Sequence, residues 1–210
     1  MKIEIKNLSK SFKNTQVLNK TNLTFEDGKI YGIIGRNGSG KSVFFKMLCG
    51  FYKPTTGTIT FNDKNYIKNN EFPNCVRALI EKPSFLPNLT GYENLELLSS
   101  IQNKIGHEEI VEILEEVNLL NEKDKLYSEY SLGMKQKLGI AQALMEKTDV
   151  IILDEPFNGI EEESVTKIKK ILKLLKKEGK LIFISSHINE DLDNLADKIY
   201  LIDNGEFNEK

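Results

Sequence analysis

Hydrophobic and polar residues alternate along much of the first sixty residues, the pattern of half-buried β-strands. The alternating apolar positions are Ile3, Ile5, Leu23, Phe25, Ile59 and Phe61, with Lys, Glu, Asn and Thr between them. Turn-forming pairs interrupt the pattern at Asp27-Gly28 and Asn62-Asp63. The sequence therefore predicts a β-rich N-terminal region.

Three continuous apolar runs, at residues 30–34, 150–153 and 181–184, are suited to strands buried on both faces. A glycine-rich loop and a helix over 43–49 follow the first run. A helix with Val165, Ile168, Leu172 and Leu175 on one face separates the other two. This strand-helix-strand order predicts an α/β fold with a mostly parallel sheet flanked by helices.

The middle of the chain, residues 87–144, has helical character instead. Thr90 and Glu93 are spaced as a capping box, and apolar residues over 110–117 recur with helical spacing. We expect one domain over 1–210. Its core comprises 1–86 and 145–210, and a helical part comprises 87–144.

Composition places the chain among ordinary globular proteins. Apolar residues make up 40%, charged residues 29%, and the net charge is -2, which gives no reason to expect nucleic acid as a partner. No apolar run reaches the roughly 18 to 20 residues that a membrane-spanning helix needs, so we expect a cytoplasmic protein. Cys49 and Cys75 lack the spacing of a zinc site and are expected to be free thiols.

The segment between the first buried strand and its helix matches G-x-x-x-x-G-K-[ST]. It reads Gly35, Arg36, Asn37, Gly38, Ser39, Gly40, Lys41 and Ser42. Glycines at these positions let backbone N–H groups converge on phosphate oxygens at a helix N-terminus. Lys41 is then predicted to hold the β- and γ-phosphates and Ser42 to bind Mg²⁺. The segment therefore predicts an ATP-binding loop.

Polar residues follow the two later apolar runs, at the sheet edge where ligands bind in parallel sheets. Asp154 and Glu155 follow 150–153, and we expect Asp154 to orient Mg²⁺ and Glu155 to polarise water. His187, after the last run, can donate a hydrogen bond to a γ-phosphate oxygen. The alternatives are a solvated turn for the carboxylates and an exposed surface position for the histidine.

The order of these motifs, with Ser131-Leu132-Gly133-Met134-Lys135-Gln136 between them, resembles the ATP-binding subunit of an ATP-binding cassette (ABC) transporter. The resemblance covers essentially the whole chain. It implies a P-loop NTPase with a RecA-like core, an antiparallel β subdomain and an inserted helical subdomain bearing the signature motif. It also implies hydrolysis of Mg²⁺-ATP.

In that family two subunits enclose two nucleotides, so the resemblance implies that Ser131 and Gly133 contact ATP held by a second cassette, identical or different. An ordinary helix cap is the alternative for Ser131. The resemblance further implies adenine stacking on Phe12 and a metal and water contact from Glu81 where the family usually has Gln. Residues 158–161 resemble the loop that follows the family's Walker B motif, which corresponds here to the strand at 150–153 with Asp154 and Glu155.

The string from Ile80 to Leu95 resembles the branch that exports bacitracin- and lantibiotic-type peptides or confers immunity to them. A separate membrane permease is the implied partner. It would hold the chain at the inner face of the membrane, with residues 81–92, including Phe85 and Leu86, as the docking region. Two alternatives stay open: a non-transport cassette ATPase, and a P-loop kinase or nucleotide-binding module that does not hydrolyse ATP.

Overall fold

The structure is a computed structural model that describes residues 1–210, except for the side chain of Asn189. Its centre is a six-stranded sheet in the order β5-β6-β7-β3-β8-β9. These strands are β3 (Lys29–Ile34), β5 (Val76–Leu79), β6 (Val150–Leu153), β7 (Leu181–Ser186), β8 (Lys198–Asp203) and β9 (Glu206–Glu209). All pairs are parallel except β8 with β9, which confirms the predicted α/β fold.

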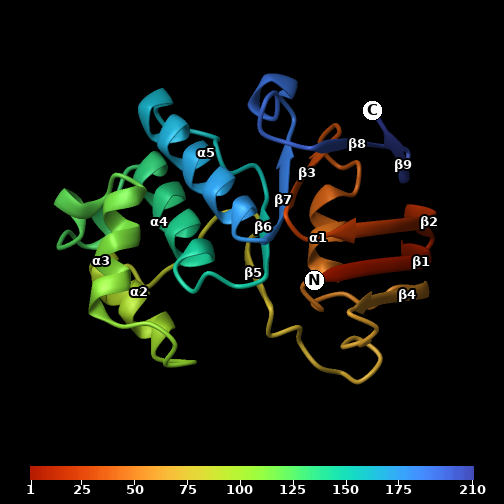
Figure 1. Cartoon of the computed structure of the whole chain (residues 1–210), viewed down its shortest axis with the longest axis horizontal. Helices are drawn as coiled ribbons and strands as arrows, with labels where there is room; N and C mark the ends of the chain where they lie inside the picture. The colour runs from red at the N-terminus through yellow and green to blue at the C-terminus, as the bar shows by residue number, and fades with distance from the viewer.

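A second, antiparallel sheet of three strands lies beside the first (Figure 1). It consists of β1 (Lys2–Phe12), β2 (Thr15–Glu26) and β4 (Thr56–Phe61). The alternating N-terminal pattern therefore does form the predicted strands. Glycines and polar residues with positive φ occupy the predicted turns, as at Gly28 (φ 65°) and Asp63 (φ 67°).

Helices cover the two faces of the six-stranded sheet unequally (Figure 1). Helix α1 (Lys41–Leu48) and the three-stranded sheet pack on one face. Helices α2 (Gly91–Ser99), α3 (His107–Glu116), α4 (Leu132–Leu144) and α5 (Glu162–Lys177) belong to the core on the other face. Short 3₁₀ turns lie at Leu120–Glu122, Tyr127–Glu129 and Asn189–Asp191. Alternation along β3 divides the two cores, because Ile30 faces one and Tyr31 the other.

The helical middle forms as its sequence pattern predicts. Thr90 and Glu93 form a capping box at the start of α2, in which the Thr90 side chain accepts from the Glu93 N–H. Helices α2, α3 and α4 all fall within 87–144, although these limits as domain boundaries stay a prediction. Across the described residues, none of the helices is long and apolar enough to cross a membrane.

Candidate functional site

The loop between β3 and α1 owes its path to its glycines. A Cβ at Gly35 would lie 2.6 Å from both the Ile202 carbonyl oxygen and Ser39 Oγ. Gly40, the N-cap of α1, has a φ of 110°, which side chains rarely tolerate. Ser39 Oγ is buried and has no hydrogen-bond partner in the described protein. The loop thus brings backbone N–H groups and one unpaired hydroxyl to a helix N-terminus.

Lys41 is buried within this loop, with 6% of the residue exposed. Its Nζ donates to the carbonyl oxygens of Gly35 at 2.7 Å and of Arg36 at 3.3 Å. The same Nζ lies 3.5 Å from Glu155 Oε1. A buried ammonium held by carbonyls and one carboxylate supplies a positive charge where phosphate oxygens can replace those partners.

Asp154 lies where β6 ends, directly beside the loop. Ser42 Oγ donates to Asp154 Oδ2 at 2.6 Å, and Ser185 Oγ donates to the other carboxylate oxygen. Ser185 also accepts from the Glu155 N–H at 2.8 Å. Ser185 was not among the predicted site residues. The signal was available: two serines close the apolar run of β7 at the ligand-binding edge of the sheet.

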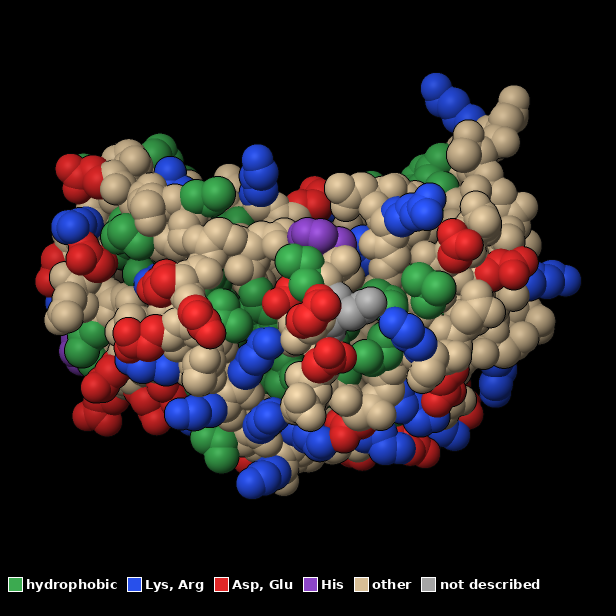
Figure 2. All heavy atoms as spheres, turned by 90° about the horizontal axis from the view of Figure 1, so that it is seen from above, with side chains coloured by type: hydrophobic (Ala, Val, Ile, Leu, Met, Phe, Trp, Pro, Cys, Tyr) green, Lys and Arg blue, Asp and Glu red, His purple; other side chains and the backbone are tan. Residues whose placement is uncertain are grey.

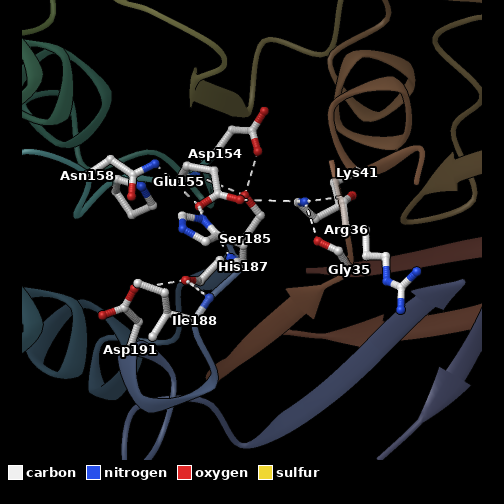
Figure 3. Close-up of polar contacts among 12 residues, drawn as sticks. Gly35, Arg36, Lys41, Asp154, Glu155, Asn158, Ser185, His187, Ile188 and Asp191 are labelled. Atoms are coloured by element: carbon white, nitrogen blue, oxygen red, sulfur yellow. Dashed lines mark hydrogen bonds and ion pairs between the residues drawn. The ribbon is translucent and has the colours of Figure 1, made fainter. Parts of the chain in front are cut away.

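Glu155 and His187 meet at the same edge (Figure 3). His187 Nδ1 is 2.7 Å from Glu155 Oε2, and the His187 N–H donates to the same oxygen at 3.3 Å. Asn158 Nδ2 donates to it at 3.5 Å. Glu155 Oε1 is buried with no hydrogen-bond partner among the described groups. One carboxylate oxygen is therefore hydrogen-bonded by its neighbours, while the other has only the ion pair with Lys41 and can accept a hydrogen bond from a further partner.

A cavity of about 560 Å³ connects these residues. Its lining contains most of the predicted site, namely Phe12, Arg36, Asn37, Gly38, Ser39, Gly40, Lys41, Ser42, Glu81, Asp154 and Glu155. It also contains residues that were not among the predicted site residues, namely Val17, Val43, Lys82, Leu132, Gln136 and Asn158. His187 does not line the cavity and reaches it through Glu155.

Phe12 and Glu81 line the same cavity and are both exposed. Phe12 is 38% exposed and makes an edge contact with Tyr52, the ring centroids being 5.2 Å apart. Lys10 Nζ lies 4.6 Å from the centre of the Phe12 ring. Glu81 follows β5 with a φ of 63° and is paired with Lys46 of α1. An exposed aromatic and an extra carboxylate thus occupy the rim.

Ser131 and Gly133 are not among the residues that line this cavity, although Leu132 between them is. Ser131 is the N-cap of α4 and accepts from the Met134 N–H at 3.2 Å. Gly133 packs so closely on the 158–161 loop that a Cβ would lie 2.5 Å from the Gly159 oxygen. Within one chain, neither of these two residues lines the cavity that the predicted phosphate loop lines.

The oxygen atoms of Ser42 and Asp154 are donors of the kind that Mg²⁺ prefers. No group of three or more His, Cys, Asp or Glu side chains suited to a metal occurs among the described residues. Mg²⁺ usually binds through one or two protein oxygens together with substrate phosphates, so a two-residue donor set beside a phosphate loop fits it.

The model of the family described as "ABC transporter" matches residues 18–158. The chain is 43% identical over 205 residues to the bacitracin transport ATP-binding protein BcrA of Enterococcus faecalis, covering 97% of this chain and 67% of that protein. It is 35% identical over 203 residues to the lantibiotic transport ATP-binding protein SrtF of Streptococcus pyogenes, covering 97% and 87%.

Solved structures are similar throughout the fold. The ATP-binding subunit of an ABC transporter superposes with a TM-score of 0.90 at 25% identity, covering 100% of this chain and 90% of the other. A dimeric ATP-binding cassette in a post-hydrolysis state with ADP and Pi gives 0.87 at 23% identity, covering 99% and 97%, and is similar in fold. Together with the loop and its carboxylates, these matches show that the chain belongs to the ABC transporter family and is an ATP-binding cassette.

Proposed function

We propose that this ABC-family ATPase binds Mg²⁺-ATP in the cavity beside Gly35–Ser42 and hydrolyses it to power transport through a separate membrane permease. One observation carries the proposal. Lys41 Nζ lies 3.5 Å from Glu155 Oε1, and Ser42 Oγ donates to Asp154 Oδ2. All four residues line the cavity beside the glycine-rich loop. The groups that we assign to phosphate, metal and water thus lie together at one edge of the sheet.

Nucleotide binding is assigned to the loop and to one aromatic side chain. The N–H groups of residues 35–42 and the Lys41 ammonium hold phosphate oxygens, and the unpaired Ser39 hydroxyl gains a partner there. Phe12 offers an exposed ring to the adenine, supported at its edge by Tyr52. Mg²⁺, when bound by Ser42 and Asp154, supplies charge neutralisation at the phosphates.

Hydrolysis is assigned to Glu155 and its neighbours. His187 and Asn158 hold one oxygen of Glu155, which leaves the buried Oε1 free to orient a water molecule toward the phosphate. We also assign to the His187 ring a hydrogen bond donated to a γ-phosphate oxygen. Glu81 at the rim contributes a second carboxylate toward the metal and the water.

We propose that a second cassette completes the site. Ser131 and Gly133 do not line the cavity of their own chain, and Ser131 presents a hydroxyl at the exposed N-terminus of α4. A cassette of the same fold is described as dimeric in a state bound to ADP and Pi. Ser131 and Gly133 then contact the γ-phosphate bound by the partner chain, and ATP joins the two chains.

The permease is assigned to the exposed stretch that follows Glu81. Leu86 is 48% exposed there, whereas Phe85 packs on Tyr127 with ring centroids 5.3 Å apart. We therefore assign docking to Leu86, and Phe85 supports the fold beneath it. Through such a permease the chain would occupy the inner face of the cell membrane. The relatives named for bacitracin and lantibiotic transport support an antibiotic peptide as cargo.

Replacement of Glu155 by Gln tests the assigned chemistry. The amide keeps the size of the side chain but cannot accept a proton, so hydrolysis should fall by at least about 100-fold. ATP binding should remain within a few fold, because Lys41 and the loop are unchanged. Phosphate release and binding of a fluorescent ATP analogue measure the two quantities.

Glu163→Gln is the matched control, since Glu163 is an exposed residue in the first turn of α5, outside the cavity lining. Its hydrolysis rate should equal that of the unchanged protein. Equal rates for Glu155→Gln and Glu163→Gln would contradict the role of Glu155. Failure of the unchanged protein to bind ATP would contradict the whole proposal.

A further inference from the structure

An ion pair joins helix α1 to the rim of the cavity. Lys46 Nζ donates to Glu81 Oε1, and the side chains are 23% and 61% exposed. Lys46 Nζ also lies 5.8 Å from the centre of the Tyr52 ring. Exposed ion pairs contribute little to stability, so the interest of this pair lies in its position.

Lys46 lies on the same helix as Ser42, and Glu81 follows the strand next to the one that Asp154 follows. Lys46 is four residues after Ser42 on α1, and residues with this spacing share one face of a helix. Glu81 is two residues beyond Leu79, whose carbonyl oxygen accepts from the Asp154 N–H at 2.8 Å. Strands β5 and β6 thus end side by side, and their carboxylates Glu81 and Asp154 line one cavity.

Without Lys46, the carboxylates of Glu81 and Asp154 would leave an excess of negative charge in this part of the cavity. Glu81 adds a second carboxylate next to Asp154, which increases negative charge at the metal donors. Hydrogen bonding to Glu81 raises the pKa of Lys46, with smaller effects in the same direction from Tyr52 and Asp154. Both carboxylates therefore favour the protonated form of Lys46.

We propose that Lys46 is a positioning residue that holds the Glu81 carboxylate at the cavity rim and so sets the Mg²⁺ concentration needed for tight nucleotide binding. The inference rests on the proposed function of the site. In the unchanged protein Lys46 competes with the cation for Glu81. Without Lys46, the Glu81 carboxylate would be free to contribute its oxygens and its charge toward a bound Mg²⁺.

A Mg²⁺ titration with a non-hydrolysable ATP analogue tests this inference without measuring turnover. The analogue is held at a fixed concentration, and its binding to the full chain is followed by calorimetry or fluorescence as Mg²⁺ is added. Lys46→Met should lower the half-saturating Mg²⁺ concentration by roughly two- to fivefold, the size expected for one exposed charge pair. Lys46→Arg should behave as the unchanged protein, because it keeps the cation.

Two further variants separate the ion pair from general charge. Lys82→Met removes a lysine that lines the same cavity, next to Glu81 in sequence, and should shift the half-saturating Mg²⁺ concentration less than Lys46→Met. In a Glu81→Gln background, Lys46→Met should not shift the half-saturating Mg²⁺ concentration, because the carboxylate that Lys46 holds is absent.

Equal shifts for Lys46→Met and Lys82→Met, or a shift that persists in the Glu81→Gln background, would overturn the inference while leaving the proposed function intact. Binding of the analogue that is independent of Mg²⁺ in the unchanged protein would overturn both. Thermal unfolding of each variant establishes that it is folded.

Discussion

At the scale of single residues, the site depends on hydroxyl groups as much as on its charges. Both oxygens of Asp154 accept from a serine, Ser42 on one side and Ser185 on the other. Ser185 is fully buried and also holds the backbone of Glu155. It therefore connects the proposed metal donor to the proposed catalytic carboxylate, which come from one strand end.

Replacing Ser185 by Ala should disturb both functions at once. The change leaves the Glu155 N–H and one Asp154 oxygen without a protein partner, which costs roughly 2 kcal/mol of unfolding free energy. We expect the Mg²⁺ concentration required for nucleotide binding to increase as well, because Asp154 loses its orientation. Chemical denaturation and a Mg²⁺ titration measure the two effects.

The control for this prediction is Ser99→Ala, which removes a buried hydroxyl bonded to the Glu96 carbonyl oxygen in α2, outside the cavity lining. It should leave the Mg²⁺ requirement unchanged. If Ser185→Ala lowers stability without altering that requirement, Ser185 has only a structural role.

At the scale of elements, helix α4 is tied to the site by consecutive buried residues. Gln136 Nε2 donates to the carbonyl oxygens of Glu155 and Pro156 at 3.2 and 3.3 Å. Lys137 Nζ donates to Glu161 Oε1 at 2.7 Å and to the Asn118 oxygen at 3.2 Å. The helix capped by Ser131 thus contacts both the segment before the 158–161 loop and Glu161, the last residue of that loop.

Acid should weaken this connection. Hydrogen bonds from Lys137 and Ser164 lower the pKa of Glu161 to about 2 from an ordinary value of 4.5. Because the folded-state pKa is the lower one, the contribution to stability is complete above pH 4.5 and is lost as pH falls toward 2. Half of the Glu161 side chain is exposed, so the effect should be modest.

Glu161→Gln should therefore be less stable than the unchanged protein at pH 7, by roughly 1 kcal/mol, and the difference should shrink below pH 4.5. Denaturant unfolding at a series of pH values measures it. Glu162 is the next residue and is exposed. Glu162→Gln should therefore differ little in stability from the unchanged protein at every pH. A Glu161→Gln difference that does not change with pH would contradict the ion pair.

Sequence pattern was a good guide to the elements with strong periodicity and a poor one to short or polar strands. The runs that became β3, β6 and β7 are wholly apolar, and the capping box marked the start of α2. Strand β5 contains Arg77, which pairs with Glu146 and breaks the apolar run. Strand β9 has mostly polar residues because it is an edge strand.

Local sequence likewise pointed to some residues of the candidate site and missed others. The phosphate loop, Asp154, Glu155 and His187 follow one another in a recognisable order, so local sequence was sufficient to predict them. Three other residues contact partners that are distant in sequence. Ser185 bonds to Asp154, 31 residues away, Gln136 to Glu155, 19 residues away, and Lys46 to Glu81, 35 residues away. Only the folded chain brings these partners together.

At the scale of the whole molecule, the proposal gives each cassette two separate surfaces, one for its own nucleotide and one for the nucleotide held by its partner. The loop and carboxylates line the cavity, while Ser131 and Gly133 lie at the start of α4 outside its lining. Figure 2 shows acidic and basic side chains interspersed on the face it displays, in keeping with the net charge of -2. In the proposed dimer, ATP bound between two cassettes holds the two chains together.

Measuring the mass of Glu155→Gln in solution, with and without Mg²⁺ and ATP, tests whether ATP joins two copies of this chain, because the variant should bind ATP and hydrolyse it slowly. We expect a monomer without nucleotide, a dimer with Mg²⁺-ATP, and a monomer again when Ser131→Arg is added to block contact with the partner's phosphate. If the variant binds ATP yet stays monomeric, or forms the same dimer with Ser131→Arg, an ATP-joined dimer of two copies with Ser131 in its interface is excluded.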